Sequence, residues 1–341
     1  MRTLPVGLGE PTVVEAVAQE WGLPVGRLRY VALGGGSYHW LADTPDGRKF
    51  FLTVDDLEDK PWLGADPGSA FGGLRAAFGT ALALRERAGL PFVVAPVPSL
   101  GGEAVSRLTP RYSLAVFPFV AGQAGQWGRD LTQPDRDVLA GLLAELHLAT
   151  PKVAALAPHR GMELHERAAL ETALAELGGP WSGGPFAEPA RRELAAKADV
   201  VVGWLASFDS LAAHVTDSRP GLVVTHGEPH PGNIIRAGSR LSLIDWDTVA
   251  LAPPERDLWM LDDGSPGALA RHSEATGRAV DAKSISFYRL AWTLADIAAF
   301  TGVLRAAHQR DHDTEHAWTA LKMSLEPDPP ARTRPFHHLP G

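Results

Sequence analysis

The chain has 341 residues, of which 45% are apolar and 21% charged, so it is long enough to form two lobes or one large domain around a substantial core. It has no cysteine, which excludes disulfides and thiolate metal sites, and no segment has the composition of a signal peptide or a membrane helix. Together these features predict a cytoplasmic protein without a membrane partner. The net charge of −8 argues against nucleic acid as the main partner and is compatible with a cationic small-molecule substrate.

The first third of the sequence predicts a small β-rich lobe over residues 1–117. Apolar periodicity and turn residues predict its elements in chain order: a helix over 11–21, strands over 29–33, 38–42 and 49–54, a helix over about 72–89, and strands over 93–98 and 112–117. A glycine-rich stretch follows, and we expect residues 118–122 to act as a hinge.

From residue 123 the pattern becomes mainly helical, which predicts a second and larger lobe over 123–325. Amphipathic periodicity predicts its helices over 137–148, 164–177, 189–215 and 284–308, with a last helix ending near residue 325. The proline-rich tail, residues 326–341, is expected to be flexible. The predicted fold class is therefore α+β, with a β-rich first lobe and a helical second lobe.

A polar hairpin inside the helical lobe carries the strongest functional signal. Two apolar runs, 222–224 and 241–244, predict neighbouring strands. Their loops hold a group of polar side chains: His226, Glu228, His230, Asn233, Asp245 and Asp247. Paired strands place Glu228 and Asn233 beside Asp245. A carboxylate to orient a hydroxyl, with an amide and a second carboxylate to hold Mg²⁺, are the groups that phosphoryl transfer requires.

The loop 226–233, HGEPHPGN, resembles the catalytic loop of the aminoglycoside phosphotransferase and choline kinase-like family, whose usual form is His-Gly-Asp-x-His-x-x-Asn. The segment 244–247, IDWD, resembles the metal-binding segment of that family, and the spacing between the two also agrees. Pro254 and Asp257 resemble the element that follows, in which the aspartate has a structural role. The resemblance implies a protein-kinase-like fold and an ATP-dependent O-phosphotransferase that acts on a small hydroxylated molecule.

The resemblance implies roles for the hairpin residues. Asn233 and Asp245 would hold Mg²⁺, and Asp247 is a further ligand, a substrate contact or a solvated side chain. Glu228 stands where the family has an aspartate. The longer side chain implies either a pocket built around glutamate or impaired catalysis, because small misplacements are costly. Pro229 stiffens the backbone beside Glu228, which favours the active enzyme.

The two histidines of the loop have two interpretations. Imidazole suits zinc, so His226 and His230 could hold that metal in a hydrolase. However, the loop contains two prolines and a glycine, which exclude a helix that presents both histidines on one face. In the family pattern both histidines are structural hydrogen-bonding residues, and we favour that interpretation, with His230 supporting the site.

The nucleotide site implied by the resemblance lies in the first lobe and the hinge. Its candidate residues are Gly34, Gly35, Gly36 and Ser37, whose backbone would approach phosphates, and Phe117, Phe119 and Val120, which would surround adenine. The third strand departs from the kinase pattern because Thr53 stands where a phosphate-binding lysine is expected.

A replacement for the missing lysine is not selected by the sequence. Lys49 is about 13 Å away along the strand, too far for a simple exchange. Lys60 and Arg75 remain open as candidates. The following helix offers one glutamate, Glu86, near its end. These departures motivate the alternative that the protein is a pseudokinase, which binds nucleotide as a sensor or scaffold.

The acceptor site is expected in the helical lobe. Its candidate residues, which could contact amines or hydroxyls, are Asp262, Asp263, Tyr288 and Asp296. The implied acceptors are aminoglycoside-like compounds, nucleosides or other antibiotics, and amino sugars, and the sequence does not choose among them.

Overall fold

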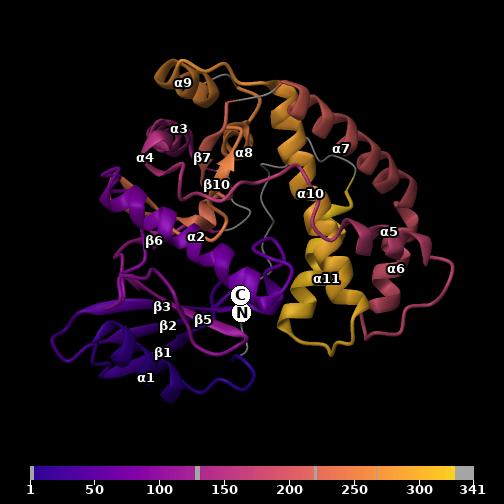
Figure 1. Cartoon of the computed structure of the whole chain (residues 1–341). Coiled ribbons are helices and arrows are strands. Elements are labelled where there is room, and N and C mark those ends of the chain that lie inside the picture. Colours follow the sequence, from indigo (N-terminus) through magenta and orange to yellow (C-terminus); the bar gives the residue numbers. More distant parts are fainter. Residues whose placement is uncertain (1–3, 127–130, 219–220, 266, 327–341) are drawn as a thin grey trace.

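The computed structural model describes residues 4–126, 131–218, 221–265 and 267–326. Of the predicted flexible tail, all but the first residue lies outside these ranges. The chain has an antiparallel sheet in its first part and a largely helical second part, so it is an α+β protein with two lobes (Figure 1). Within the described residues, no helix is both long and apolar enough to span a membrane.

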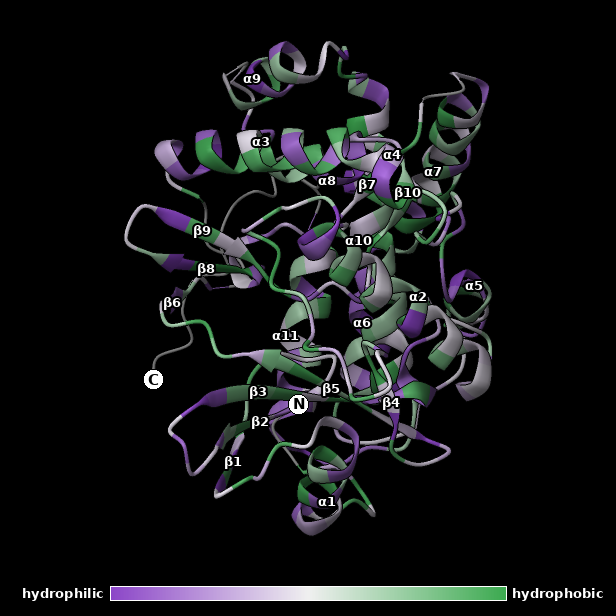
Figure 2. Cartoon of the chain, turned by 60° about the vertical axis from the view of Figure 1, so that its left-hand side comes forward, coloured by the Kyte–Doolittle hydropathy of each residue, from purple (hydrophilic) through white to green (hydrophobic). Residues whose placement is uncertain are grey.

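The first lobe is built on a five-stranded antiparallel sheet with the order β1-β2-β3-β5-β4. Its strands are β1 (Arg27–Val31), β2 (Tyr38–Asp43), β3 (Lys49–Asp56), β4 (Ser106–Arg107) and β5 (Tyr112–Pro118). Alternation along β3 gives the sheet two faces. Phe50, Leu52 and Val54 are buried in one cluster with residues of helix α1 (Glu10–Trp21), so Thr53 and Asp55 belong to the opposite face. Figure 2 shows α1 on one side of this sheet and the helical lobe on the other.

Two details of this lobe differ from the predictions. Helix α2 (Pro67–Glu86) starts five residues early, because Asp66 and Ser69 form a capping box and Pro67 occupies the first turn. The expected strand over 93–98 is wrong. It makes one isolated bridge, from Val93 to Leu243 of the second lobe, and its two prolines have no N–H group for a sheet ladder. The fifth strand is the short β4 instead.

The second lobe contains the expected helices and two small sheets. Its helices are α3 (Gln133–Leu148), α4 (Thr150–Val153), α5 (Arg167–Ala175), α6 (Ala187–Ala196), α7 (Ala198–Ser218), α8 (Glu255–Leu258), α9 (Gly267–Thr276), α10 (Ala282–Arg305) and α11 (His312–Ser324). The single helix predicted over 189–215 is two helices, which break at Lys197 without a glycine or proline to signal the break.

The apolar runs 222–224 and 241–244 both form strands, but the predicted pairing between them is wrong, because they lie in two separate small sheets. One sheet has the order β6-β8-β9 and the other pairs β10 with β7. The strands are β6 (Gln123–Ala124), β7 (Val223–Thr225), β8 (Ile234–Ala237), β9 (Arg240–Leu243) and β10 (Ala250–Ala252). Short 3₁₀ turns complete the fold: η1 (Leu57–Asp59), η2 (Pro231–Asn233) and η3 (Trp259–Leu261).

The predicted hinge, 118–122, runs from the end of β5 to the start of β6. It therefore connects the sheet of the first lobe to the hairpin of the second. Gly122 allows this close passage, because a Cβ atom there would lie 2.5 Å from the backbone oxygen of Arg236.

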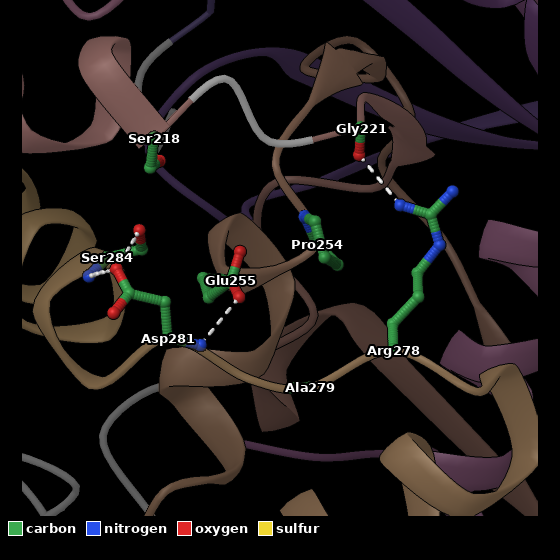
Figure 3. Close-up of a pocket in the computed structure, with 8 residues that line it drawn as sticks. All are labelled: Ser218, Gly221, Pro254, Glu255, Arg278, Ala279, Asp281 and Ser284. Atoms are coloured by element: carbon green, nitrogen blue, oxygen red, sulfur yellow. Dashed lines mark hydrogen bonds between the residues drawn. The ribbon is translucent and has the colours of Figure 1, made fainter.

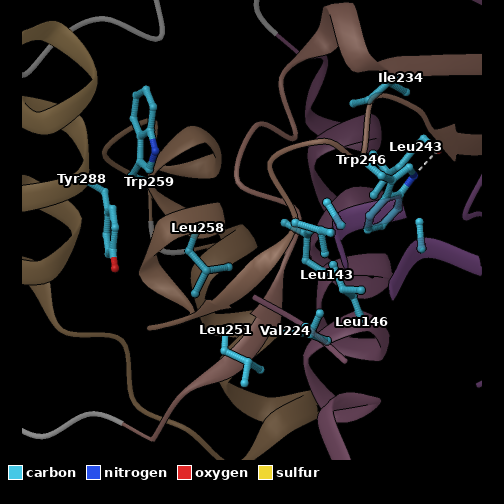
Figure 4. Close-up of a cluster of buried hydrophobic side chains, with 14 of the residues drawn as sticks. Leu143, Leu146, Val224, Ile234, Leu243, Trp246, Leu251, Leu258, Trp259 and Tyr288 are labelled. Carbon is cyan, nitrogen blue, oxygen red and sulfur yellow. Dashed lines mark hydrogen bonds between the residues drawn. The ribbon is translucent and has the colours of Figure 1, made fainter. Parts of the chain in front are cut away.

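Residues of the β8–β9 hairpin belong to a large apolar core of the second lobe, part of which is shown in Figure 4. Trp246 is fully buried in it, and its indole N–H donates to the backbone oxygen of Leu243 at 3.0 Å. Leu143 and Leu146 of α3 and Val224 of β7 are buried in the same core. The segment that carries Asp245 and Asp247 is therefore fixed by a large buried side chain between them, which restricts how far either carboxylate moves.

Candidate active site

The loop 226–233 is held by a buried carboxylate. Asp257 of α8 accepts hydrogen bonds from the backbone N–H groups of His226, at 2.9 Å, and Gly227, at 2.6 Å. It also accepts one from the ring of His147, at 3.0 Å, which in turn lies 2.9 Å from His272. Gly227 has a φ of 98°, and a Cβ atom there would collide with the guanidinium of Arg256. This geometry agrees with the structural role that the resemblance implies for Asp257.

His226 joins the loop to the strand that precedes Asp245. Its Nε2–H donates to the backbone oxygen of Ile244 at 2.8 Å, and its Nδ1 accepts the N–H of Glu228 at 3.2 Å. Burial lowers the pKa of this imidazole, so it stays neutral. Both nitrogens are occupied, which leaves none for zinc. Across the described part of the chain, no group of three or more His, Asp or Glu side chains is arranged to hold a metal.

His230 lies between Glu228 and Trp292 of α10. Its Nε2 is 3.9 Å from a carboxylate oxygen of Glu228, and its ring meets Trp292 edge-on at 6.3 Å. Burial lowers the pKa of His230 to about 3. A neutral imidazole in this position does not form an ion pair with the Glu228 carboxylate.

Glu228 and Asn233 are connected through the backbone. The side-chain amide of Asn233 donates from Nδ2 to the Glu228 carbonyl at 3.0 Å. Its Oδ1 is therefore the atom left to bind a cation. Asp245 has a φ of 66°, a left-handed conformation that only one other non-glycine residue among those described adopts. Such strain is typical of functional sites.

Negative charge is concentrated where these residues meet. Burial, and then the charge of Asp247, raise the pKa of Glu228 to about 7 and raise that of Asp245 well above its ordinary value. A third of the Glu228 side chain is accessible, so a substrate can reach it. The Asn233 carbonyl and the Asp245 carboxylate are hard oxygen donors, and these residues fit a Mg²⁺ ion.

Lys60 enters the site from the first lobe, just after β3 and η1. It is 1% exposed, and its Nζ lies 2.9 Å from Asp55 and 2.7 Å from Asp247. Of the two candidates that the sequence left open, the structure brings only Lys60 to this place. Arg75 forms an exposed ion pair with Glu103.

The predicted nucleotide residues fall into two groups. Ser37 is buried, and its hydroxyl donates to Asp55 at 2.6 Å, which connects the glycine-rich turn to Lys60. Gly34 has a φ of 65°, and added Cβ atoms at Gly35 and Gly36 would meet no other atom within 4 Å. In contrast, the Phe117 side chain packs edge-on against Phe78 of α2, within the core.

The hinge side chains that follow Phe117 are more accessible. Phe119 is 44% exposed, and Val120 is half-buried. Lys49 is also exposed and lies near the Phe119 ring, with 5.9 Å between Nζ and the ring centroid. Adenine contacts at the hinge therefore remain a prediction for Phe119, Val120 and the backbone.

With this geometry established, comparisons with known proteins identify the family. A family model described as the phosphotransferase enzyme family matches residues 29–283. The chain belongs to this family. It is a small-molecule phosphotransferase with a protein-kinase-like fold, as the sequence resemblance implied.

Individual relatives agree with this assignment. The chain is similar to protein StrN of Streptomyces griseus, with 30% identity over 258 residues that cover 72% of this chain and 75% of StrN. It is also similar to the solved structure of spectinomycin phosphotransferase APH(9)-Ia, with a TM-score of 0.74 and 16% identity over 95% of this chain and 97% of the other. Choline kinase LicA from Streptococcus pneumoniae gives a TM-score of 0.56, with 14% identity over 93% and 98%.

Two of the predicted acceptor residues in this phosphotransferase already have cationic partners. Asp262 pairs with Arg289 at 2.8 Å, and Asp263 pairs with Arg136 at 2.7 Å. Tyr288 of α10 is buried, with its hydroxyl 3.9 Å from the sulfur of Met162. Asp296 also lies on α10.

Arg160, which the sequence did not suggest, lies near Glu228 and Arg256. Its guanidinium donates to the backbone oxygen of Trp62 at 3.0 Å. Burial and the neighbouring Arg256 lower the pKa of Arg160 to about 10, while the charge of Glu228 opposes this shift. A positive charge thus lies near the Glu228 carboxylate.

A separate cavity of about 340 Å³ lies between the end of α7 and the start of α10 (Figure 3). Glu255 accepts the N–H of Asp281 there at 3.0 Å, and Arg278 donates to the oxygen of Gly221 at 2.9 Å. It contains none of the predicted site residues, so it is distinct from the active site.

Proposed function

We propose that the protein is an ATP-dependent O-phosphotransferase that moves the γ-phosphate to a hydroxyl of a small molecule. The observation that carries this proposal is the meeting of Glu228, Asn233 and Asp245 on one anchored loop and one adjoining turn. The acceptor classes are aminoglycoside-like compounds, other antibiotics, nucleosides and amino sugars.

The geometry of the loop supports the following roles. The acceptor oxygen attacks the γ-phosphorus, the bond from that phosphorus to the ADP oxygen breaks, and the hydroxyl proton passes to the Glu228 carboxylate. A raised pKa suits this role, because a base works best near the operating pH. His226 and Asn233 fix the backbone on both sides of Glu228 and so orient the carboxylate.

Asn233 and Asp245 are the residues that would hold Mg²⁺. When bound, the ion neutralises the charge that develops on the transferred phosphoryl group. Asp245 is held for this purpose by the buried Trp246 beside it and by its left-handed backbone. Asp247, which is paired with Lys60, would add a further negative charge near the ion.

The molecules that similar proteins bind support the proposed acceptor classes. APH(9)-Ia was solved with ADP and spectinomycin, and this likeness extends over nearly the whole of both chains. A cationic acceptor would have to share Asp262 and Asp263 with their arginine partners or use other groups. A neutral hydroxylated acceptor, such as a sugar, needs no such exchange.

The test is a screen for ADP release with ATP and, separately, GTP. Acceptors should include spectinomycin, kanamycin, a macrolide, amino sugars, nucleosides and choline, with mass spectrometry of the products. We expect a phosphorylated product from at least one hydroxylated acceptor and none from the Glu228→Gln variant. Nucleotide binding without any product across the panel would favour the nucleotide-binding pseudokinase.

A further inference from the structure

The third strand, β3, has no lysine at the position where a phosphate-binding lysine is expected. Thr53 of β3 occupies that position, and its hydroxyl lies 3.3 Å from Nδ1 of His39 on the neighbouring strand. In kinases, a lysine on the third strand contacts the α- and β-phosphates and is held by a carboxylate from a helix. The nucleotide site therefore needs a cation and a supporting carboxylate from elsewhere.

The ammonium group of Lys60 returns to the end of this same strand. Asp55, which lies 2.9 Å from Lys60 Nζ, is two residues beyond Thr53 and on the same face of β3, roughly 7 Å along the strand. Asp247, which belongs to the second lobe, lies 2.7 Å from the same nitrogen. The Lys60 ammonium, held beside Asp55, thus places a positive charge two residues along β3 from Thr53.

Lys60 lies beside the glycine-rich turn that the resemblance assigns to the phosphates. The hydroxyl of Ser37, in the glycine-rich turn, lies 3.3 Å from its Nζ. Although burial lowers the pKa of Lys60, the charges of Asp247, Asp55 and Asp245 raise it above its ordinary value, so the ammonium stays charged. The cation therefore lies between the turn that would cover the phosphates and the carboxylate that would hold the metal.

We propose that Lys60 is the residue that binds the nucleotide phosphates, with Asp55 in place of the helix glutamate. This inference rests on the proposed function of the site. Helix α2 has a single glutamate, Glu86, in its last position, and this residue is exposed. The other candidate cation, Arg75, is exposed and paired with Glu103.

The first experiment measures nucleotide affinity by calorimetry, in the presence of Mg²⁺, for ATP, ADP and adenosine. Replacing Lys60 by Met should lower the affinity for ATP and for ADP by roughly 10- to 100-fold, because a charge-assisted contact to phosphate is lost. Adenosine should bind as it does to the wild type. Arg75→Met is the matched control and should leave all three affinities unchanged.

The second experiment separates phosphate binding from a purely structural bridge. Without Lys60, Asp55 and Asp247 lose their buried partner, and one oxygen of Asp55 already accepts no hydrogen bond from the described residues. Lys60→Met should therefore lower the unfolding temperature. The double variant Asp55→Asn, Lys60→Met should recover part of that loss while its ATP affinity stays low.

Two results would overturn the inference while leaving the proposed function intact. One is wild-type ATP affinity in folded Lys60→Met protein. The other is recovery of ATP affinity together with stability in the double variant, since that is what a bridge between the lobes predicts. If the wild type itself binds no ATP, the proposed function fails, and this inference fails with it.

Discussion

Shortening Glu228 to aspartate is the sharpest probe of how this site is built. The backbone of Glu228 is fixed at both ends, because its N–H donates to His226 at 3.2 Å and its carbonyl accepts from Asn233 at 3.0 Å. Pro229 further restricts the chain. The backbone is therefore unable to follow a shorter side chain toward the acceptor.

The expected size of the effect follows from this geometry. Removing one methylene withdraws the carboxylate by about 1.5 Å. A displacement of about 1 Å costs on the order of 100-fold in rate, or about 2.7 kcal/mol of transition-state stabilisation. We therefore expect kcat of Glu228→Asp to fall by roughly 100-fold. The KM for ATP should hardly change, because Asn233, Asp245 and Lys60 remain in place.

The assay is steady-state ADP release with the best acceptor of the panel, with thermal unfolding to verify the fold. Glu228→Gln keeps the length and removes the charge, and it should be at least as slow as Glu228→Asp. A Glu228→Asp variant as fast as the wild type, or faster, would refute the reasoning. It would mean that the glutamate is an imperfect substitute in a pocket shaped for aspartate.

Three further predictions concern the support beneath the loop. Asp257→Asn replaces an acceptor of the His226 and Gly227 N–H groups by a donor, so kcat should fall on the order of 100-fold and the unfolding temperature should also fall. Steady-state kinetics and calorimetry check this, and an unchanged kcat would contradict it. Gly227→Ala should destabilise the protein in the same assays, because φ is 98° and Arg256 blocks a methyl group, and wild-type stability would oppose this. Burial lowers the pKa of His272 from 6.5 to about 4, so below pH 6.5 the unfolded chain binds this proton more readily than the folded one. On acidification from neutral pH to pH 5.5, the wild type should therefore lose about 1 kcal/mol of stability relative to His272→Gln. Denaturant unfolding of both proteins at the two pH values measures this difference. A difference in stability that does not change with pH would exclude the prediction.

The fold was predictable where local pattern decides it. The alternation in β2 and β3 and the periodicity of α3 and α10 gave elements close to those observed. The errors have local causes of two kinds. The capping box at Asp66 was a readable signal that extends α2, whereas the break at Lys197 has no glycine or proline to announce it.

The candidate site also has a part that the sequence predicts and a part that it does not. Asn233 and Asp245 lie at the two ends of the β8–β9 hairpin, and Glu228 is five residues before Asn233, so the motif already implied that the three meet even though the predicted pairing of β7 with β9 was wrong. Lys60 and Asp247 are 187 positions apart, and their contact depends on how the two lobes pack. No periodicity or turn signal encodes such a contact.

Lobe packing also explains the outcome at two acceptor candidates. The sequence offered Asp262 and Asp263 as carboxylates for a cationic substrate. Their arginine partners, Arg289 and Arg136, come from α10 and α3, and only the assembled helical lobe brings them together. Asp257 lies close by in the sequence, and its structural role was readable from the motif that surrounds it.

The central claim is that phosphoryl transfer requires the carboxylate of Asp245, which would hold Mg²⁺ beside Glu228. The most direct test is mass-spectrometric detection of the phosphorylated acceptor formed by wild type and by Asp245→Asn under identical conditions, with thermal unfolding to show that both are folded. We predict product from the wild type and none above background from the folded variant. Product formation by Asp245→Asn at the wild-type rate would contradict the account.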